Sequence, residues 1–399
     1  MGRRSGALLG VGLLLGCGGL TGPLYMPPPA PDGPLVLTGG RLLTPEGWAD
    51  GTLVLEGDAI RCVGDCDVPD GATVLEVAGF EVVPGLVDLH VHLGVTTRDG
   101  AMGLSDLMLG RPGMRRGFLE HGITSVRPLC DDEGFAQIHV QRMEEGSWAG
   151  PRMFPVGPCF TAPKGHPARD LPPHLVAGGV RTPTSEAEAR EQVRALHGAG
   201  FPGVKVVYDD GGPLAFERMD ADRMAAVIDE ARQQGMWVAA HIGSNEELIA
   251  AVKAGATTIE HAPRTPLSEE AVEAMREAKV RFVPTLAVIE ALGGDAWLRA
   301  ATASTLRAHE AGVALGVGSD TQGPDMAFGE GTHRELELLA EAGVERDELL
   351  SAATVGAAEA LQREDLGRLT VGAVGDVVVL VPGTWEVHKV LSRGRVVVE

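Results

Sequence analysis

The stretch PGLVDLHVHLG, residues 84–94, places two histidines one residue apart at the end of an apolar run. Side chains alternate between the two faces of a β-strand, so a strand here would point His90 and His92 to one side and Val91 to the other. Two imidazoles on one side can bind the same metal ion. The pair alone is equally typical of an ordinary amphipathic strand, so the rest of the chain has to decide between the two interpretations.

Seven further apolar runs follow at intervals, and amphipathic stretches with helical periodicity lie between them. The eight runs are residues 82–92, 122–129, 152–160, 203–210, 236–242, 256–262, 281–288 and 313–321. Eight strands that alternate with helices predict an α/β fold, a (β/α)8 TIM barrel over residues 84–362. Residues 35–83 and 363–399 read instead as short strands with turns, which predicts a small β-sandwich built from both termini.

The first 17 residues contain two arginines and a short apolar run that ends in Leu-Leu-Gly-Cys. This segment resembles a bacterial lipoprotein signal peptide, which implies lipid on Cys17 and an exported chain anchored to a membrane, facing the periplasm or the outer surface. An ordinary cleaved signal, with Cys17 removed or left free, is the alternative. Residues 18–34 are rich in proline and predict an extended, poorly packing tether.

The formal net charge of −21 argues against a nucleic-acid partner, because the phosphate backbone would be repelled. Four cysteines remain after Cys17, an even number in a compartment where disulfides persist. We expect Cys62 to pair with Cys66 and Cys130 with Cys159. Free buried thiols are the alternative.

Polar residues end several of the apolar runs: His90 and His92, Lys205, His241, His261 and Asp320. In a TIM barrel the chemistry sits at the carboxyl ends of the strands, so these six residues would share one face. Each has an ordinary structural interpretation, but together those interpretations would require independent coincidences on five strands.

Lys205 differs from the other five because an ammonium group buried beside metal ions would be strongly disfavoured. Burial lowers the pKa of the amine, and a neutral amine can take up carbon dioxide to become a carbamate. That anion could bridge two metal ions.

With PGLVDLHVH in front, and with residues 371–378 (VGAVGDVV) near the end, this constellation resembles the amidohydrolase superfamily in its binuclear, carboxylated-lysine form. The resemblance implies that His90, His92 and Asp320 hold one divalent ion, His241 and His261 the other, and carboxylated Lys205 both. Zinc suits these ligands, although manganese, iron, cobalt or nickel could use them too. The implied mechanism is attack by a metal-bridging hydroxide, with Asp320 as acid and base and Lys205 as part of the catalytic centre.

Two stretches are similar to the imidazolonepropionase-related and Xaa-Pro dipeptidase-like members: residues 122–127, where Pro128 follows in place of an Asp, and residues 161–166, where Lys164 replaces a Gly. The resemblance implies hydrolysis of an amide C–N bond in a small substrate, a dipeptide or an N-acyl amino acid. We expect Arg127, His166 and Tyr208 to bind it.

Three alternatives remain open. A deaminase of the same superfamily would place a Glu three residues after the fifth-strand histidine, where this chain has Ser244. Cyclic amide, phosphotriester or lactone hydrolysis would use the same hydroxide. A metal- or solute-binding lipoprotein without catalysis would lack a ligand such as Lys205 or Asp320. Neither the exact substrate nor the oligomeric state follows from the sequence.

Overall fold

The computed structural model describes residues 25–94, 111–169, 178–322 and 326–399. The predicted signal peptide, Cys17 and the first part of the tether lie outside these residues. No helix in the described ranges is both long and apolar enough to cross a membrane.

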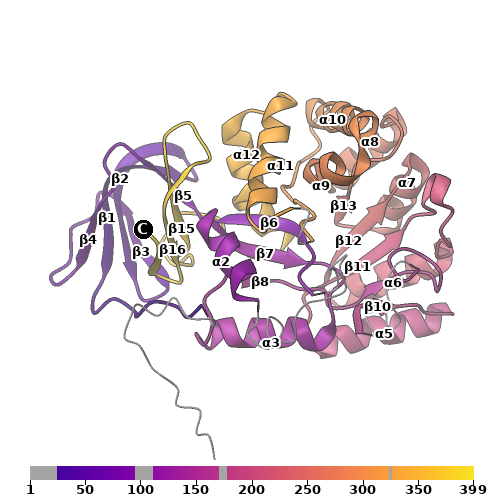
Figure 1. The fold of residues 1–399 in the computed structure, drawn as a ribbon, viewed down its shortest axis with the longest axis horizontal. Helices are drawn as coiled ribbons and strands as arrows, with labels where there is room; N and C mark the ends of the chain where they lie inside the picture. Colours follow the sequence, from indigo (N-terminus) through magenta and orange to yellow (C-terminus); the bar gives the residue numbers. More distant parts are fainter. Residues whose placement is uncertain (1–24, 95–110, 170–177, 323–325) are drawn as a thin grey trace, which may run out of the picture.

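Parallel strands form the centre of the molecule (Figure 1). They are β6 (Leu86–Val91), β7 (Ile123–Pro128), β8 (Arg152–Met153), β9 (Cys159–Phe160), β11 (Gly203–Tyr208), β12 (Trp237–Ile242), β13 (Thr258–Glu260) and β14 (Arg281–Val283), with the short β10 (Val180–Arg181) beside β9. Because β8 pairs with β7 while β9 pairs with β11, the single run 152–160 joins the two parts of the sheet.

Residues 313–321 close the ring on the other side. Phe282 and Leu315 form a bridge to β14, and Val91 and Thr321 form a bridge to β6. The Asp320 amide also donates to the His90 carbonyl at 2.7 Å. All eight predicted runs therefore take their places in one barrel.

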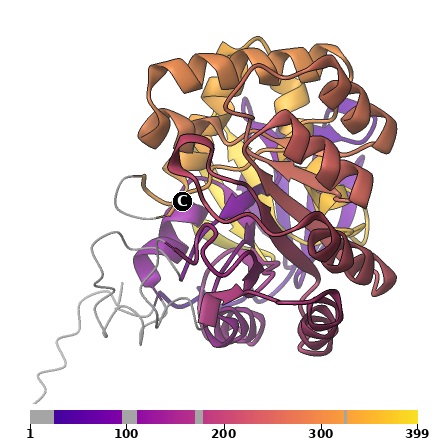
Figure 2. The same ribbon diagram turned by 90° about the vertical axis from the view of Figure 1, so that its right-hand side faces the viewer.

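Helices cover the outside of these strands (Figure 2). They are α2 (Pro112–Glu120), α3 (Glu133–Glu144), α5 (Glu186–Gly198), α6 (Ala221–Gln233), α7 (Asn245–Ala254), α8 (Glu269–Ala278), α9 (Leu286–Val288), α10 (Asp295–Glu310), α11 (Glu330–Glu341), α12 (Arg346–Ala353) and α13 (Val355–Ala360), with single turns at η1 (Gly212–Leu214) and η2 (Ile289–Gly293).

Side-chain caps begin five of these helices, and Asp132 caps the first of them, α3, by accepting from the Phe135 amide. Ser185, Asp220, Ser244 and Ser268 each accept a hydrogen bond from a backbone N–H in the first turn of α5, α6, α7 and α8. The capping serine of α7 is the residue whose position a deaminase would fill with Glu. Here its side chain serves the helix.

The remaining strands come from both ends of the chain. They are β1 (Leu35–Thr44), β2 (Gly47–Glu56), β3 (Ala59–Gly64), β4 (Thr73–Glu76), β5 (Glu81–Pro84), β15 (Val377–Leu380), β16 (Val387–Ser392) and β17 (Arg395–Val398). β5 pairs with β15, so the two termini meet in one eight-stranded sheet. Ile60 exchanges backbone hydrogen bonds with residues 372 and 373, which brings β3 back to the segment before β15 around a core of leucines and valines.

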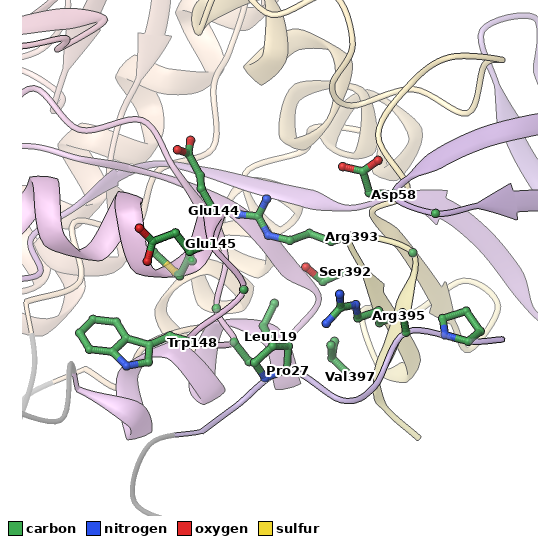
Figure 3. A pocket seen from close by; sticks show the side chains of 18 residues that line it. Pro27, Asp58, Leu119, Glu144, Glu145, Trp148, Ser392, Arg393, Arg395 and Val397 are labelled. Carbon is green, nitrogen blue, oxygen red and sulfur yellow. The ribbon is translucent and has the colours of Figure 1, made fainter. Parts of the chain in front are cut away.

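The described part of the tether packs against the body of the protein, in contrast to the loose spacer predicted from its prolines. The Tyr25 carbonyl accepts hydrogen bonds from the Ala149 amide at 2.8 Å and from Arg115 Nη1 at 3.1 Å, and Arg395 donates to the Pro28 carbonyl at 3.1 Å. A cavity of about 320 Å³ lies between this segment, the end of α3 and the loop before β17 (Figure 3). Prolines lack an N–H donor, but their carbonyls still accept, as that of Pro28 does from Arg395.

Both expected disulfides are present. Cys62 is bonded to Cys66 within the N-terminal β-region, and Cys130 is bonded to Cys159 between the ends of β7 and β9, with Cα–Cα distances of 6.1 and 4.6 Å.

Candidate metal centre

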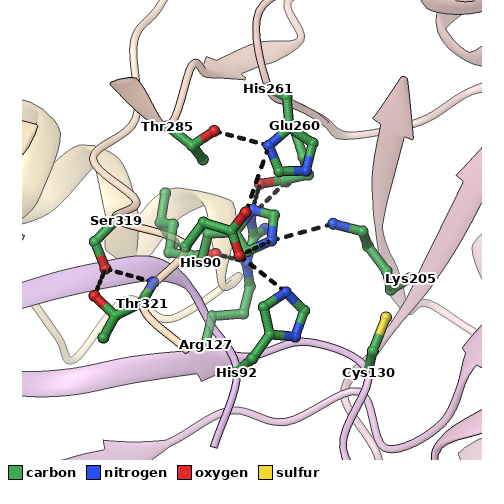
Figure 4. A network of polar contacts seen from close by, with 12 residues as sticks. His90, His92, Arg127, Cys130, Lys205, Glu260, His261, Thr285, Ser319 and Thr321 are labelled. Atoms are coloured by element: carbon green, nitrogen blue, oxygen red, sulfur yellow. Dashed lines mark hydrogen bonds and ion pairs between the residues drawn. The ribbon is translucent and has the colours of Figure 1, made fainter. Parts of the chain in front are cut away.

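The ends of the barrel strands surround one small pocket of about 70 Å³. Its lining consists of His92, Cys130, His166, Pro167, Lys205, Val207, His241, His261, Asp320 and Gln322. His90 is fully buried and contacts two of these lining residues, Lys205 and Asp320 (Figure 4). All six residues predicted as metal ligands therefore lie at one place, although they come from five strands of the barrel.

Three donor groups define the first half of the centre: His90, His92 and Asp320, whose ligand atoms lie within 4.8 Å of one another. Asp320 Oδ1 is 3.0 Å from His92 Nε2 and 3.6 Å from His90 Nε2. Oδ1 is buried and makes no hydrogen bond of normal geometry among the described residues. A buried carboxylate oxygen facing two imidazole nitrogens fits a divalent cation, so the donor set suits the ion that the sequence predicts.

His241 and His261 form the second half. Their ring centroids lie 4.3 Å apart, and the His90 and His261 centroids lie 4.9 Å apart, so the two halves are adjacent. Burial lowers the pKa of the His241 imidazole to about 4, which keeps it in the neutral form that binds metals. His261 Nδ1 lies 2.7 Å from Thr285 Oγ1, and this contact fixes the ring orientation.

Lys205 is 1 % exposed and lies between the two halves, with Nζ 3.4 Å from His90 Nε2. Burial lowers the pKa of its amine to about 8, and the positive charge of Arg127 adds to that effect against the carboxylates of Glu260 and Asp320. The neutral form of this amine is therefore populated at a much lower pH than that of an ordinary lysine.

His90 is supported from behind by a buried acid that sequence reasoning missed. His90 Nδ1 lies 2.9 Å from Glu260 Oε2, and Glu260 Oε1 accepts from Arg127 Nη2 at 2.6 Å and from Thr258 Oγ1 at 2.5 Å. Burial would raise the pKa of Glu260, but Arg127 and His90 outweigh it and lower the pKa to about 2. A carboxylate can only accept here, so Nδ1 carries the proton and Nε2 is free for a metal ion.

A left-handed backbone turns two ligands into the pocket. Along β13, Thr258 and Glu260 share one face, so simple alternation would point His261 to the other. The φ angle of His261 is 71°, and that of Asp320 is 56°, both in the region that residues other than glycine rarely adopt. This turn at the strand end lets Glu260 and His261 both face inward.

Asp88 joins the first strand to the last. Its carboxylate accepts from the His90 amide at 2.9 Å and the Ser319 amide at 3.1 Å, and from the hydroxyls of Ser319 at 2.6 Å and Thr332 at 2.7 Å. Burial raises the pKa of Asp88 to about 6 despite these hydrogen bonds. The residue thus holds β6 and the Asp320 strand in register.

Two of the three predicted substrate-binding residues lie elsewhere. Arg127 is fully buried under the metal centre and pairs with Glu260, so its guanidinium supports His90 instead of reaching the pocket. Tyr208 is three residues beyond Lys205 on β11 and faces the opposite side, where it packs in the core with Arg218 4.8 Å from its ring centroid. His166 does line the pocket, and its ring lies 5.4 Å from that of His241.

Comparison with known proteins agrees with this geometry. The family model described as "Amidohydrolase family" matches residues 82–397. Ochratoxinase from Aspergillus niger is 26 % identical over 91 % of this chain and 84 % of its own length. Imidazolonepropionase from Streptomyces griseus is also 26 % identical, over 83 % of this chain and 85 % of its own. A solved prolidase in complex with N-methylphosphonate-L-proline superimposes with a TM-score of 0.76 at 27 % identity, over 91 % of this chain and 99 % of that one.

The chain belongs to the amidohydrolase family. It is an enzyme, a hydrolase that acts on amide bonds.

Proposed function

We propose that this enzyme uses two divalent metal ions to hydrolyse the amide bond of a dipeptide or an N-acyl amino acid, with Xaa-Pro dipeptides as the first candidates. The observation that carries the proposal is the convergence of six donor residues from five strands on one pocket. The similarity to a prolidase bound to a proline derivative supports the substrate class.

His90, His92 and Asp320 would hold one ion, and His241 and His261 the other. Two such ions, most simply zinc, supply a nucleophilic water of low pKa and polarise the scissile carbonyl. The protein's own part is to bury His90, His241 and His261, which lowers the pKa of each imidazole, and to orient His90 through Glu260 and His261 through Thr285.

Lys205 would act as a carbamate that contacts both ions. Its amine is buried between the two halves of the centre, where a cation would repel the metals and an anion would attract them. Formation of the carbamate from the neutral amine and carbon dioxide releases one proton and needs no other reactant.

Asp320 would move the proton. Oδ1 faces His92 at 3.0 Å and Oδ2 lies 3.8 Å from His261 Nδ1, so the carboxylate sits between the two halves, within reach of a water held there. It would take a proton from the attacking water and deliver it to the leaving nitrogen, which is the step that makes an amine a good leaving group.

The test is a substrate screen on full-length protein loaded with zinc, manganese or cobalt. Xaa-Pro dipeptides, other dipeptides and N-acyl amino acids are incubated separately, and the released amino acid is quantified by mass spectrometry. We expect turnover that falls at least about 100-fold in Lys205→Ala and Asp320→Asn. Glu273→Gln, which alters an exposed ion pair on α8, serves as the matched control. Equal activity in Lys205→Ala would refute the carbamate, and no turnover at full metal loading would refute the substrate class.

Hydrolysis of a cyclic amide is the second candidate, because imidazolonepropionase is among the similar proteins. The same panel should therefore contain cyclic amides and five-membered imidazolones. Faster turnover of these compounds than of every linear amide would reverse the ranking.

We also propose, from the N-terminal segment, that the enzyme is exported and anchored through lipid on Cys17. Membrane fractionation and mass spectrometry of the mature N-terminus, with Cys17→Ala beside the wild type, would test this. A mature chain without lipid on Cys17 would refute it.

A further inference from the structure

We propose that Asp209 and Arg264 form a positioning pair that holds His241 as a ligand of the second metal ion, so that loss of the pair weakens one ion selectively. The inference rests on the proposed binuclear centre. It concerns the metal affinity of one half of that centre and does not depend on which amide is cleaved.

The contacts of Asp209 decide which nitrogen of His241 faces the pocket. Asp209 Oδ2 lies 3.2 Å from His241 Nε2, and the carboxylate is 2 % exposed. An ionised carboxylate only accepts hydrogen bonds, so Nε2 carries the proton and Nδ1 keeps its lone pair for a metal ion. Hydrogen bonding of this kind also raises the basicity of a ligating imidazole.

Arg264 keeps Asp209 in place. Its guanidinium contacts both carboxylate oxygens, with Nη1 2.8 Å from Oδ1 and Nη2 in close contact with Oδ2, while the Gly211 amide adds a third donor to Oδ1 at 2.8 Å. A planar fork on a carboxylate fixes orientation as well as charge. These contacts hold the pKa of Asp209 far below its ordinary value, against the burial that would raise it.

The backbone is built to let the two side chains meet. The Arg264 amide donates to the Gly243 carbonyl at 3.0 Å, which ties the loop after β13 to the end of β12. A Cβ at Gly243 would collide with the Arg264 guanidinium and with the Asp209 carboxylate. The contact between Arg264 and Asp209 therefore requires glycine at position 243.

The two halves of the centre differ in what stands behind their imidazoles. On the first side, His90 is backed by Glu260 and Arg127, both fully buried. On the second side, Thr285, a neutral hydroxyl, contacts His261, so Asp209 is the carboxylate that supports this half. Among the described residues, neither Asp209 nor Arg264 forms a hydrogen bond or ion pair with His90, His92 or Asp320, so a change at this pair should act on the second ion.

The experiment measures zinc affinity on metal-free, full-length protein by competition with a chromophoric chelator, together with the cobalt absorption spectrum. Wild type should bind two ions per chain. In Asp209→Asn and Arg264→Gln, we expect the affinity for one ion to fall about 10- to 100-fold while the other changes little. Arg264→Lys, which keeps the charge without the fork, should lose less. Asp210→Asn, which changes the neighbouring exposed carboxylate, is the matched control and should retain both affinities.

Several outcomes would overturn the inference: a wild type that binds one ion, variants that keep both affinities, or an equal loss at both ions. Melting of the metal-free variants separates a positioning role from general unfolding, because a selective loss must appear in protein that still unfolds cooperatively near the wild-type temperature. Two ions bound by the wild type and one lost in the variants, without hydrolysis of any amide, would refute the proposed function and leave this inference standing.

Discussion

Replacing Glu260 by glutamine would strip the buried Arg127 guanidinium of its carboxylate. Both side chains are fully excluded from solvent and lie 2.6 Å apart. Breaking one side of such a pair costs about 3–5 kcal/mol, because the remaining charge stays buried without compensation. With an unfolding entropy of about 2.1 cal/mol/K per residue, 399 residues give about 0.8 kcal/mol/K, so the melting temperature should fall by about 4–6 °C.

The assay is calorimetric melting of the metal-free protein, which excludes any contribution from bound ions. Glu273→Gln changes the same residue type in an Arg pair of the same length, 2.6 Å, but on the surface, and should shift the melting temperature by less than about 1 °C. The double variant Arg127→Met with Glu260→Gln should lose less than the sum of the single variants, because it leaves no unpaired charge. A loss below about 1 °C in Glu260→Gln, or strictly additive losses, would refute the reasoning.

Three further predictions concern stability. Burial lowers the pKa of His333 to about 4, although the hydrogen bond from its Nε2 to the His121 carbonyl opposes that shift, so below pH 6.5 the unfolded chain binds more protons at this residue than the folded chain. Acidification from pH 7.5 through 4 should therefore lower the free energy of unfolding by about 3 kcal/mol through this residue. In melting curves recorded across this range, His333→Gln should show a weaker dependence of stability on pH. An unchanged dependence would contradict the prediction. Burial raises the pKa of Glu335 to about 8, so the stability that its protonated carboxyl contributes is lost as pH rises from 4.5 through 8. Glu335→Gln should therefore be more stable than wild type at pH 8.5, and this difference in stability should close at pH 5. A difference independent of pH would count against this explanation. Removing the Cys62–Cys66 bond, whose cysteines are 4 residues apart, should lower the free energy of unfolding by about 2 kcal/mol. Removing Cys130–Cys159, whose cysteines are 29 residues apart, should lower it by about 3.5 kcal/mol, because the longer loop restricts the unfolded chain more. The reverse order in denaturant unfolding of the two Cys→Ser double variants would contradict this loop-entropy explanation.

The barrel and the convergence of its candidate metal ligands were open to prediction because both depend on short-range pattern. Apolar runs mark the strands, and the carboxyl ends of parallel strands meet at one face of the barrel, so His90, Lys205 and Asp320 could be brought together without coordinates. The same pattern placed the β-strands of both termini in one domain, since neither flank contains helical periodicity.

The position of Tyr208 follows from the alternation of side chains along β11. It lies three residues from Lys205 on one strand, and an odd separation places two side chains on opposite faces. Once Lys205 was placed in the barrel, Tyr208 belonged to the outer layer. His261 departs from this alternation. Strict alternation from Glu260 would point the His261 ring away from the pocket, and its positive φ angle turns the ring inward.

The residues behind the ligands could not be predicted, because their partners are far apart in the sequence and carry no fixed spacing. Arg127 and Glu260 are separated by 133 residues, and Asp209 and Arg264 by 55. The packed tether was missed for a similar reason, since proline content describes the free chain and the arginines that bind its carbonyls come from distant elements.

These distant pairs also determine the charge that the metal centre presents. Glu260 is neutralised by Arg127 and Asp209 by Arg264, so each acid polarises its imidazole without adding net charge to the site. Imidazoles bind metal ions in their neutral form, which would leave Asp320 and Lys205 to balance the proposed ions. With an ammonium at Lys205 the two would cancel, and nothing would offset two dications in a buried pocket. With the proposed carbamate the pair would supply two negative charges, so we expect the chemical state of Lys205 to decide whether this site holds one ion or two.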